Sequence, residues 1–291
     1  MPIRLPRLNL VDTFLRLLGG GIVAIAVIGS ILTIAGGRFG VAEWQSFVAA
    51  GLALGSVYAL IALGYTLVYG VLFMINFAHG EVFMWGTFTA YFAATGLENA
   101  GMFESNPVVA LLLTLAVAMT VSMCVAIGLE RVAYRPLRNA PRLVPLITAI
   151  GASLFLQYTA RGFYGSGVRS YPEFHLFEGD INLGFMVVDM RDVLVVVAAL
   201  VLMTALYLFI ERTRTGRAMR AVAEDKDVAA MMGINVDRII VITFAIGGLL
   251  AGAAGILYIF IFNQVQFYMG FLPGIKAFTA AVRGGIGNVV G

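Results

Sequence analysis

The sequence predicts an all-α fold: a polytopic transmembrane helix bundle of about eight spans with its N-terminus in the cytoplasm. Hydrophobic residues make up 60% of the 291 residues. Charged residues make up only 12%, whereas soluble domains carry roughly 25%. Several apolar stretches also reach or approach the roughly 20 residues that a helix needs to cross a bilayer core. We therefore expect residues 1–291 to form a single transmembrane domain.

The first predicted span is the apolar run Leu17–Ile34, which follows three arginines within the first 16 residues. A basic segment before an apolar run resembles a secretory signal, and Ala24-Ile25-Ala26 mimics a cleavage site. The apolar run continues well past that tripeptide. We therefore expect an uncleaved span, with the 16 N-terminal residues in the cytoplasm.

The other predicted spans follow from the remaining apolar runs, with loose boundaries. They are Ser46–Ile75, Glu81–Thr95, Pro107–Leu129, Leu143–Ala160, Val193–Ile210, Ile239–Phe262 and Pro273 onward.

The charges in the loops agree with this alternation. The two loops expected in the cytoplasm, residues 130–142 and 211–238, hold four and six basic residues. The expected outer loop, residues 97–106, holds Glu98 and Glu104 and no basic residue. This is the asymmetry that the positive-inside rule requires. The largest expected outer loop, residues 161–192, has mixed charge and several aromatic residues, and we expect a small external cap there.

Several function classes lack the residues that they need. The lysines are Lys226 and Lys276, and neither follows a glycine as a P-loop requires, so the chain does not hydrolyse ATP by that route. No metal-ligand spacing or nucleophile pairing is present, so we expect no metal, no cofactor and no enzymatic activity. The basic residues lie in short loops and form no soluble patch for nucleic acid. A lone cysteine, Cys124, lies in an apolar run, which is typical of ordinary packing.

Three polar residues, Asn76, His79 and Glu81, lie between two apolar runs with no true loop around them. The run before them is about 30 residues, roughly 45 Å as a helix, and the run after is too short to span. Both lengths make sense if the chain breaks within the membrane, with Asn76 capping the next helix and the other two residues in its first turn. Ionisable groups at that depth are candidates for function. The alternative is a tight cytoplasmic turn with His79 among the lipid headgroups.

The loop Glu211–Arg238 is long for a connection and carries helix signals. Thr215 is a candidate cap for a helix over 216–222, Asp225 for a second helix through Met232, and Gly233 suits a left-handed terminus. Two short polar helices at the cytoplasmic face suggest a docking surface. Its expected apolar contacts are Ala218, Met219, Ala221 and Val222. A solvated connector is the alternative.

Two pairs of glycines are spaced four residues apart within predicted spans. Gly51 and Gly55 form one pair, and Gly248 and Gly252 form the other. Small residues at this spacing share one helix face and allow close helix packing in lipid. We expect both pairs to pack helices, and lining a substrate path is compatible with that role.

The motifs in combination resemble the LivH-type permeases of branched-chain amino acid ATP-binding cassette importers. The resemblance covers roughly Ser46 to the end. It rests on the segments 51–65, 74–81, 130–138, 215–220 with Gly233, 273–278 and 284–288.

That resemblance implies alternating access of Leu, Ile or Val across the inner membrane, powered by partner subunits. The implied partners are a second, LivM-like permease, two ATPase subunits and a periplasmic substrate-binding protein, and residues 161–192 would be periplasmic. The polar segment would line the path or its gate. Coupling to the ATPase would fall to the loop residues Gly216, Arg217, Ala218, Arg220, Ala221, Glu224 and Gly233.

Two positions depart from such permeases. Arg283 stands where an apolar residue is usual, and the chain stops at Gly291, where the last helix normally continues. Two other functions stay open. One keeps the machinery and carries urea, short amides or other amino acids; the other is a stand-alone transporter or channel with His79 and Glu81 as a proton relay.

Overall fold

The computed structural model describes residues 10–285, apart from positions 38, 139, 142, 175–178 and 183–186. Two predictions lie partly outside these residues: the cytoplasmic placement of Arg4 and Arg7, and the last span beyond Gly285.

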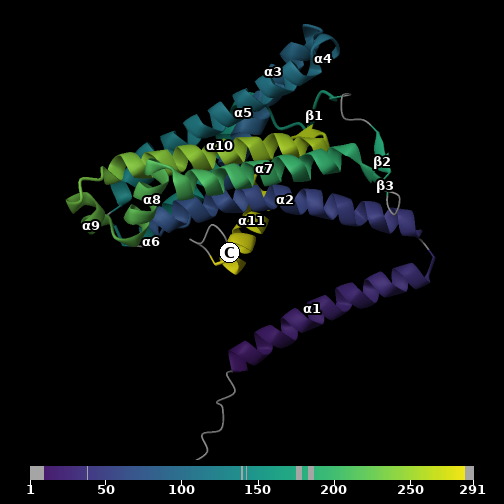
Figure 1. The fold of residues 1–291 in the computed structure, drawn as a ribbon, viewed down its shortest axis with the longest axis horizontal. Helices are drawn as coiled ribbons and strands as arrows, with labels where there is room; N and C mark the ends of the chain where they lie inside the picture. Colours follow the sequence, from purple (N-terminus) through teal and green to yellow (C-terminus); the bar gives the residue numbers. More distant parts are fainter. Residues whose placement is uncertain are drawn as a thin grey trace, which may run out of the picture.

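The described chain is mostly helical, with four short strands (Figure 1). The α-helices are α1 (Leu10–Ala35), α2 (Val41–Leu72), α3 (His79–Asn99), α4 (Met102–Ser105), α5 (Pro107–Leu129), α6 (Leu143–Tyr164), α7 (Met190–Arg212), α8 (Arg214–Glu224), α9 (Lys226–Met231), α10 (Val236–Phe262) and α11 (Phe271–Arg283). A π-helical turn η1 (Glu130–Tyr134) and a 3₁₀ turn η2 (Arg135–Leu137) extend α5. The strands are β1 (Arg169–Ser170), β2 (Asp180–Asn182), β3 (Val187–Asp189) and β4 (Gln264–Val265).

Six of the described helices are long and apolar enough to cross a membrane: α1, α2, α5, α6, α7 and α10. They correspond to six of the eight predicted spans. The third predicted span, α3, has 21 residues but is too polar to meet that criterion, and about half of its residues are buried against neighbouring helices. The eighth, α11, has 13 described residues, which is about 20 Å of helix and too short for a 30 Å bilayer core.

The bundle has two distinct ends (Figure 1). At one end, which we call the basic end, the loop after α5 meets the start of α10, where Arg138 forms ion pairs with Glu130 and Asp237. The hairpin α8–α9 lies at this same end. At the opposite end, the backbone N–H of Tyr171 donates to the carbonyl of Asn263 at 3.1 Å. The two loops predicted to be cytoplasmic therefore share one end, and the described part of the predicted outer loop 161–192 lies at the other.

The opposite end carries the strands, which the all-α prediction omitted. β1 pairs with β4 and β2 pairs with β3, both antiparallel. These pairs lie outside the apolar helices, where an extended backbone needs hydrogen-bond partners from another segment. The described part of loop 161–192 contributes strands to both of these two-stranded ribbons.

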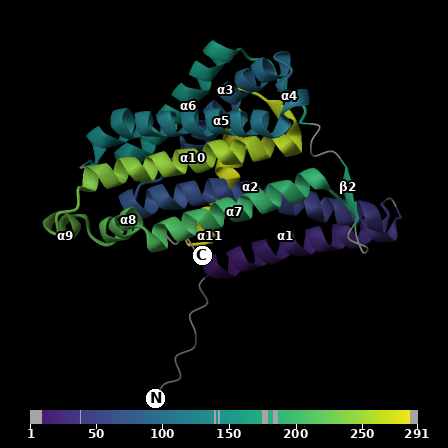
Figure 2. The same ribbon diagram turned by 45° about the horizontal axis from the view of Figure 1, so that its top comes forward.

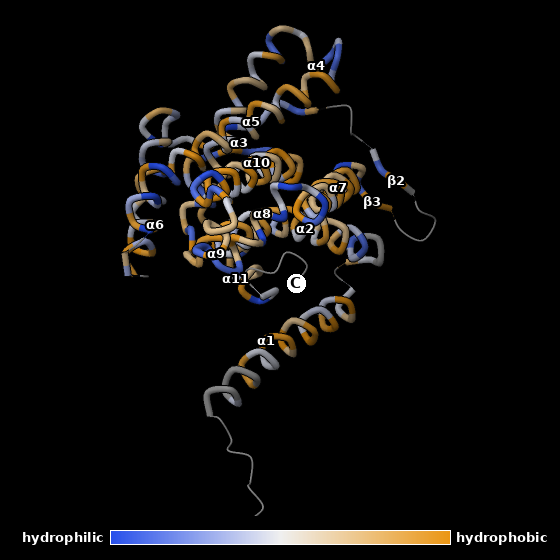
Figure 3. Tube along the Cα trace, turned by 60° about the vertical axis from the view of Figure 1, so that its left-hand side comes forward, coloured by the Kyte–Doolittle hydropathy of each residue, from blue (hydrophilic) through white to orange (hydrophobic). Residues whose placement is uncertain are grey.

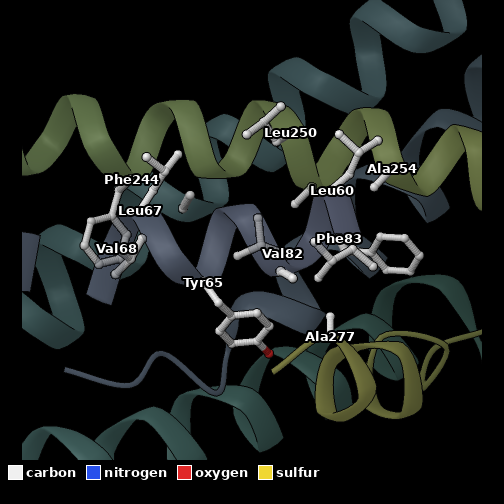
Figure 4. Packing of buried hydrophobic residues seen from close by; sticks show 14 of the residues in the cluster. Leu60, Tyr65, Leu67, Val68, Val82, Phe83, Phe244, Leu250, Ala254 and Ala277 are labelled. Atoms are coloured by element: carbon white, nitrogen blue, oxygen red, sulfur yellow. The ribbon is translucent and has the colours of Figure 1, made fainter. Parts of the chain in front are cut away.

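The helix α3 lies at the centre of the core. Its Val82 and Phe83 pack among Leu60 of α2 and Ala254 of α10 (Figure 4). The Ser122 hydroxyl of α5 donates to the carbonyl of Val82 at 2.9 Å. The neighbouring helices shield the polar groups of α3 in this way, and that shielding lets a helix of modest hydrophobicity lie inside the bundle.

The two glycine pairs lie in different surroundings. A Cβ at Gly252 would lie 2.5 Å from the carbonyl oxygen of Ala118, and one at Gly248 would lie 2.7 Å from that of Ser122. Both glycines therefore bring the backbones of α10 and α5 into close contact. A Cβ at Gly51 or Gly55 would meet no described atom within 4 Å. This second pair lies on an open face of α2.

The first helix, α1, lies apart from the bundle in Figures 1 and 3. Its described large apolar side chains from Leu17 to Ile34 are all exposed, and Figure 3 colours many residues along this helix as hydrophobic. Figure 2 gives the bundle from another side, with α7 and α2 running along one another. An exposed apolar helix of this length is what a lipid-facing span requires.

Candidate functional site

The chain breaks between α2 and α3, as one of the two readings of the polar segment predicts. Phe73 ends α2 in the left-handed conformation with φ 56°, and α3 starts at His79. His79 lies against Gly64 of α2 and Gly247 of α10. These glycines lie eight residues before the end of α2 and eleven after the start of α10, which is about 12 Å and 16 Å from the basic end. The start of α3 is therefore deep in the bundle, unlike a turn at its surface.

Asn76 does not cap α3, which corrects the prediction. The N-cap position is Ala78, with no side-chain hydrogen bond. The Asn76 Oδ1 instead accepts a hydrogen bond from the Tyr134 hydroxyl at 2.7 Å, and both side chains are buried. A buried amide is stable only with partners, and the π-helical turn η1 supplies one here. This hydrogen bond connects the segment between α2 and α3 to the turn that follows α5.

His79 occupies the first turn of α3, as predicted. Its ring lies 4.9 Å from the Tyr65 ring in an edge-to-face arrangement. The space that it fills exists because position 64 is a glycine, since a Cβ there would overlap the imidazole. Its Nε2 is buried and has no hydrogen-bond partner among the described residues.

Glu81 is also in the first turn of α3 and is 1% exposed. The Ser153 hydroxyl of α6 donates to its Oε1 at 3.3 Å. Its Oε2 is buried without a described partner. A carboxylate in the first turn is stabilised by the partial positive charge of the helix N-terminus. Glu81 nevertheless keeps one acceptor oxygen free inside the bundle.

A cavity of about 260 Å³ lies beside Glu81. Its polar groups come from Glu81, Ser153 and Tyr65, and its apolar wall comes from α6 and α11. The Tyr65 hydroxyl points toward α11 in Figure 4. The turn before α11 approaches closely enough that a Cβ at Gly80 would lie 2.5 Å from the carbonyl oxygen of Gly270. Close backbone contact here bounds the cavity on one side. The sequence did not indicate Ser153, Tyr65 or Gly270, because only the fold brings them to Glu81.

The loop Glu211–Arg238 forms the two predicted helices, α8 and α9, with one correction. The cap of α8 is Thr213, whose hydroxyl accepts from the N–H of Gly216 at 2.9 Å, and Thr215 lies inside the helix. The side chain of Asp225 caps α9 by accepting from two backbone N–H groups. Gly233 has φ 84° and ends this hairpin in the left-handed conformation, as predicted.

The exposed side chains of the hairpin differ from the expected ones. Met219 and Val222 are buried against the bundle, and Gly216 is buried because α8 approaches Ile210 closely. Ala218 and Ala221 are half-buried, whereas Arg217, Arg220 and Glu224 are exposed. Arg220 pairs with Glu211 of the same chain. Arg217 has no partner among the described residues.

Three exposed apolar residues at the tip of the hairpin were not among the predicted contacts. Val228, Met231 and Met232 are 50%, 78% and 79% exposed. They lie on or next to α9, at the extreme of the basic end (Figure 1). Helical spacing of Val228, Met231 and Met232 was the available indication, since residues three and four apart share a face.

One contact joins this hairpin to the break. The Lys226 ammonium lies 5.9 Å from the centre of the Phe73 ring. Burial, followed by the positive charge of Arg138, lowers the pKa of Lys226, while Asp227 raises it. The start of α9 thus contacts the residue that ends α2.

Two further predictions concern metals and Arg283. No group of three or more His, Cys, Asp or Glu side chains that could hold a metal occurs among the described residues. Arg283 is the last residue of α11 and is exposed.

Comparisons with known proteins agree with these features. A family model described as branched-chain amino acid transport system / permease component matches residues 47–291. The chain is 44% identical over 244 residues to the high-affinity branched-chain amino acid transport system permease protein BraD of Pseudomonas aeruginosa, covering 83% of this chain and 79% of that protein.

Two other relatives carry similar names. The chain is 43% identical over 247 residues to the high-affinity permease protein LivH of Escherichia coli, covering 83% of this chain and 79% of that protein. It is 29% identical over 243 residues to the probable permease protein LivH of Methanocaldococcus jannaschii, covering 81% and 72%. No solved structure matches the chain. With six apolar helices and a family match over most of its length, this multi-pass membrane protein belongs to the branched-chain amino acid transport system permease family.

Proposed function

We propose that this chain is a membrane permease subunit of an ATP-binding cassette importer that moves branched-chain amino acids by alternating access. The observation that carries the proposal is the 44% identity, over 83% of this chain, to a permease named for that transport. The polar, broken segment deep inside the bundle supports it, because discontinuous helices with exposed termini are a common device of transporters.

We place the basic end in the cytoplasm, and with it the N-terminus and residues 211–238. The clustering of both basic loops at one end supports this orientation in the inner membrane. Residues 161–192 would then face the periplasm and a substrate-binding protein.

We infer that ATP hydrolysis falls to partner subunits, because the sequence has no P-loop. The hairpin α8–α9 would dock in a groove of an ATPase. The exposed Met231 and Met232 would be the buried apolar centre of this interface, and the exposed Arg217 would lie at its rim. A movement of this hairpin would be transmitted to the translocation path through the contact between Lys226 and Phe73.

A second, LivM-like permease would complete the path. The cavity beside Glu81 is bordered by Ile150, Leu154 and Phe271, which are about half-exposed in the single chain. A path for a zwitterionic amino acid cannot have lipid as its wall, because charged groups are costly in hydrocarbon. A second subunit over α6 and α11 would replace lipid there.

The test is ATP-driven uptake of leucine, isoleucine and valine into proteoliposomes that hold the permease pair, the ATPases and the binding protein. We expect Met231→Glu to abolish stimulation of the ATPase and Arg217→Glu to reduce it. Membrane insertion should stay normal in both variants. The matched control is Arg131→Glu, a charge reversal at an exposed position of the same end outside the hairpin.

Three outcomes would overturn the proposal or a part of it. Unchanged ATPase stimulation in Met231→Glu would exclude this hairpin as the coupling element. Uptake by the permease chain alone, driven by a proton gradient, would favour the stand-alone transporter. Uptake of urea or short amides in place of branched-chain amino acids would keep the machinery and change the cargo.

A further inference from the structure

Glu81, which lines the cavity, has one acceptor oxygen that nothing in the described chain satisfies. Glu81 Oε2 is buried and unpartnered, while Oε1 accepts from Ser153. Within the part of the chain that the structure describes, no basic side chain forms an ion pair with Glu81. An unpaired carboxylate inside a membrane bundle is costly unless it is protonated or a cation arrives to share it.

The remaining surface of the cavity suits an apolar side chain. Its walls include Ile150, Leu154, Phe271 and Ile275. Its volume of about 260 Å³ lies just below the roughly 300–1,000 Å³ of pockets that hold drug-sized ligands. A cavity of this volume therefore fits a single small amino acid, and its apolar walls match an aliphatic side chain.

We propose that the free oxygen of Glu81 binds the α-ammonium group of the amino acid as it passes this cavity, while the α6–α11 wall takes its aliphatic side chain. This inference rests on the proposed function. It assigns Glu81 a direct contact with the transported amino acid, whereas its position alone indicates only that it lies near the path. A charge-assisted hydrogen bond between an ammonium and a carboxylate is among the stronger ones available in a low-dielectric site.

The carboxylate of the same amino acid also finds a donor. The Tyr65 hydroxyl lines the cavity. A tyrosine hydroxyl can donate its proton to a cargo carboxylate. Glu81 and Tyr65 then bind the two charged groups of the zwitterion, and the binding is weak enough for release because each group has a single partner.

The test compares two fragments of leucine. The compound 3-methylbutylamine keeps the ammonium and the branched chain, and 4-methylpentanoate keeps the carboxylate and the branched chain. Their binding to the purified complete transporter in nanodiscs, without the binding protein, is measured by saturation-transfer NMR, with empty nanodiscs as the blank.

We expect the wild-type transporter to bind 3-methylbutylamine more tightly than 4-methylpentanoate. Glu81→Gln should weaken binding of the amine at least tenfold, and Ser153→Ala should weaken it less. Glu98→Gln is the matched control, because it neutralises an exposed carboxylate at the other end of the same helix.

Equal binding of the amine by Glu81→Gln and the wild type would overturn the inference. If that variant fails to assemble, the wild type decides alone, since equal binding of the two fragments would also overturn it. If the transporter imports leucine and Glu81→Gln leaves binding of the amine unchanged, only this inference is refuted. One that binds the amine through Glu81 but imports no branched-chain amino acid refutes the proposed function instead.

Discussion

Replacing Gly252 with alanine tests whether close packing of α10 on α5 holds the bundle together. The new Cβ would lie 2.5 Å from the carbonyl oxygen of Ala118 and 2.7 Å from the Cα of Met119. Ordinary contacts begin at 3.4 Å, so the two helices would have to separate by about 0.9 Å. Both contacting atoms belong to backbone, and no side-chain rotation relieves the overlap.

Overpacking of this kind costs about 1–3 kcal/mol of unfolding free energy. A loss of 1 kcal/mol lowers the melting temperature by about 2–4 °C in chains of 150–250 residues. We therefore expect Gly252→Ala to lower the melting temperature of the purified protein in detergent by roughly 2–12 °C.

The matched control is Gly55→Ala, because a Cβ at Gly55 meets no described atom within 4 Å. Alanine also has the higher helix propensity, so this variant should be as stable as the wild type or slightly more so. Thermal unfolding followed by circular dichroism measures both. An unchanged melting temperature for Gly252→Ala, or an equal loss in Gly55→Ala, would refute the reasoning.

Three further predictions concern the hairpin and the break. Thr213→Ala should destabilise α8 by about 1 kcal/mol through loss of its cap, seen as faster hydrogen exchange of its amides, whereas Thr215→Ala should not. Gly64→Ala should lower the melting temperature by overlapping the imidazole of His79, and adding His79→Ala should restore part of the loss; simple additivity in the double variant would contradict this contact. Tyr134→Phe should cost about 1–3 kcal/mol in thermal unfolding, because a buried amide oxygen loses its donor, and wild-type stability would contradict it.

The sequence predicted where helices lie because long apolar runs and loop charges are local properties of the chain. It also placed His79 and Glu81 in the first turn of a helix after a break, from the length of the two neighbouring runs. It mistook Thr215 for the cap of α8, since neighbouring threonines are equivalent until the start of the helix is fixed. It expected Met219 and Val222 to face a partner, because an amphipathic period shows that a helix has two faces without showing which one meets the bundle.

By itself, then, the sequence determined the membrane class, the two basic loops and the polar segment between two apolar runs. Only the tertiary structure decided the partners of that segment: Tyr134 for Asn76, Gly64, which leaves room for His79, and Ser153 for Glu81. These contacts join residues 15 to 72 positions apart in the chain. Local propensity and periodicity carry no information at that separation, because the distances depend on how whole helices pack.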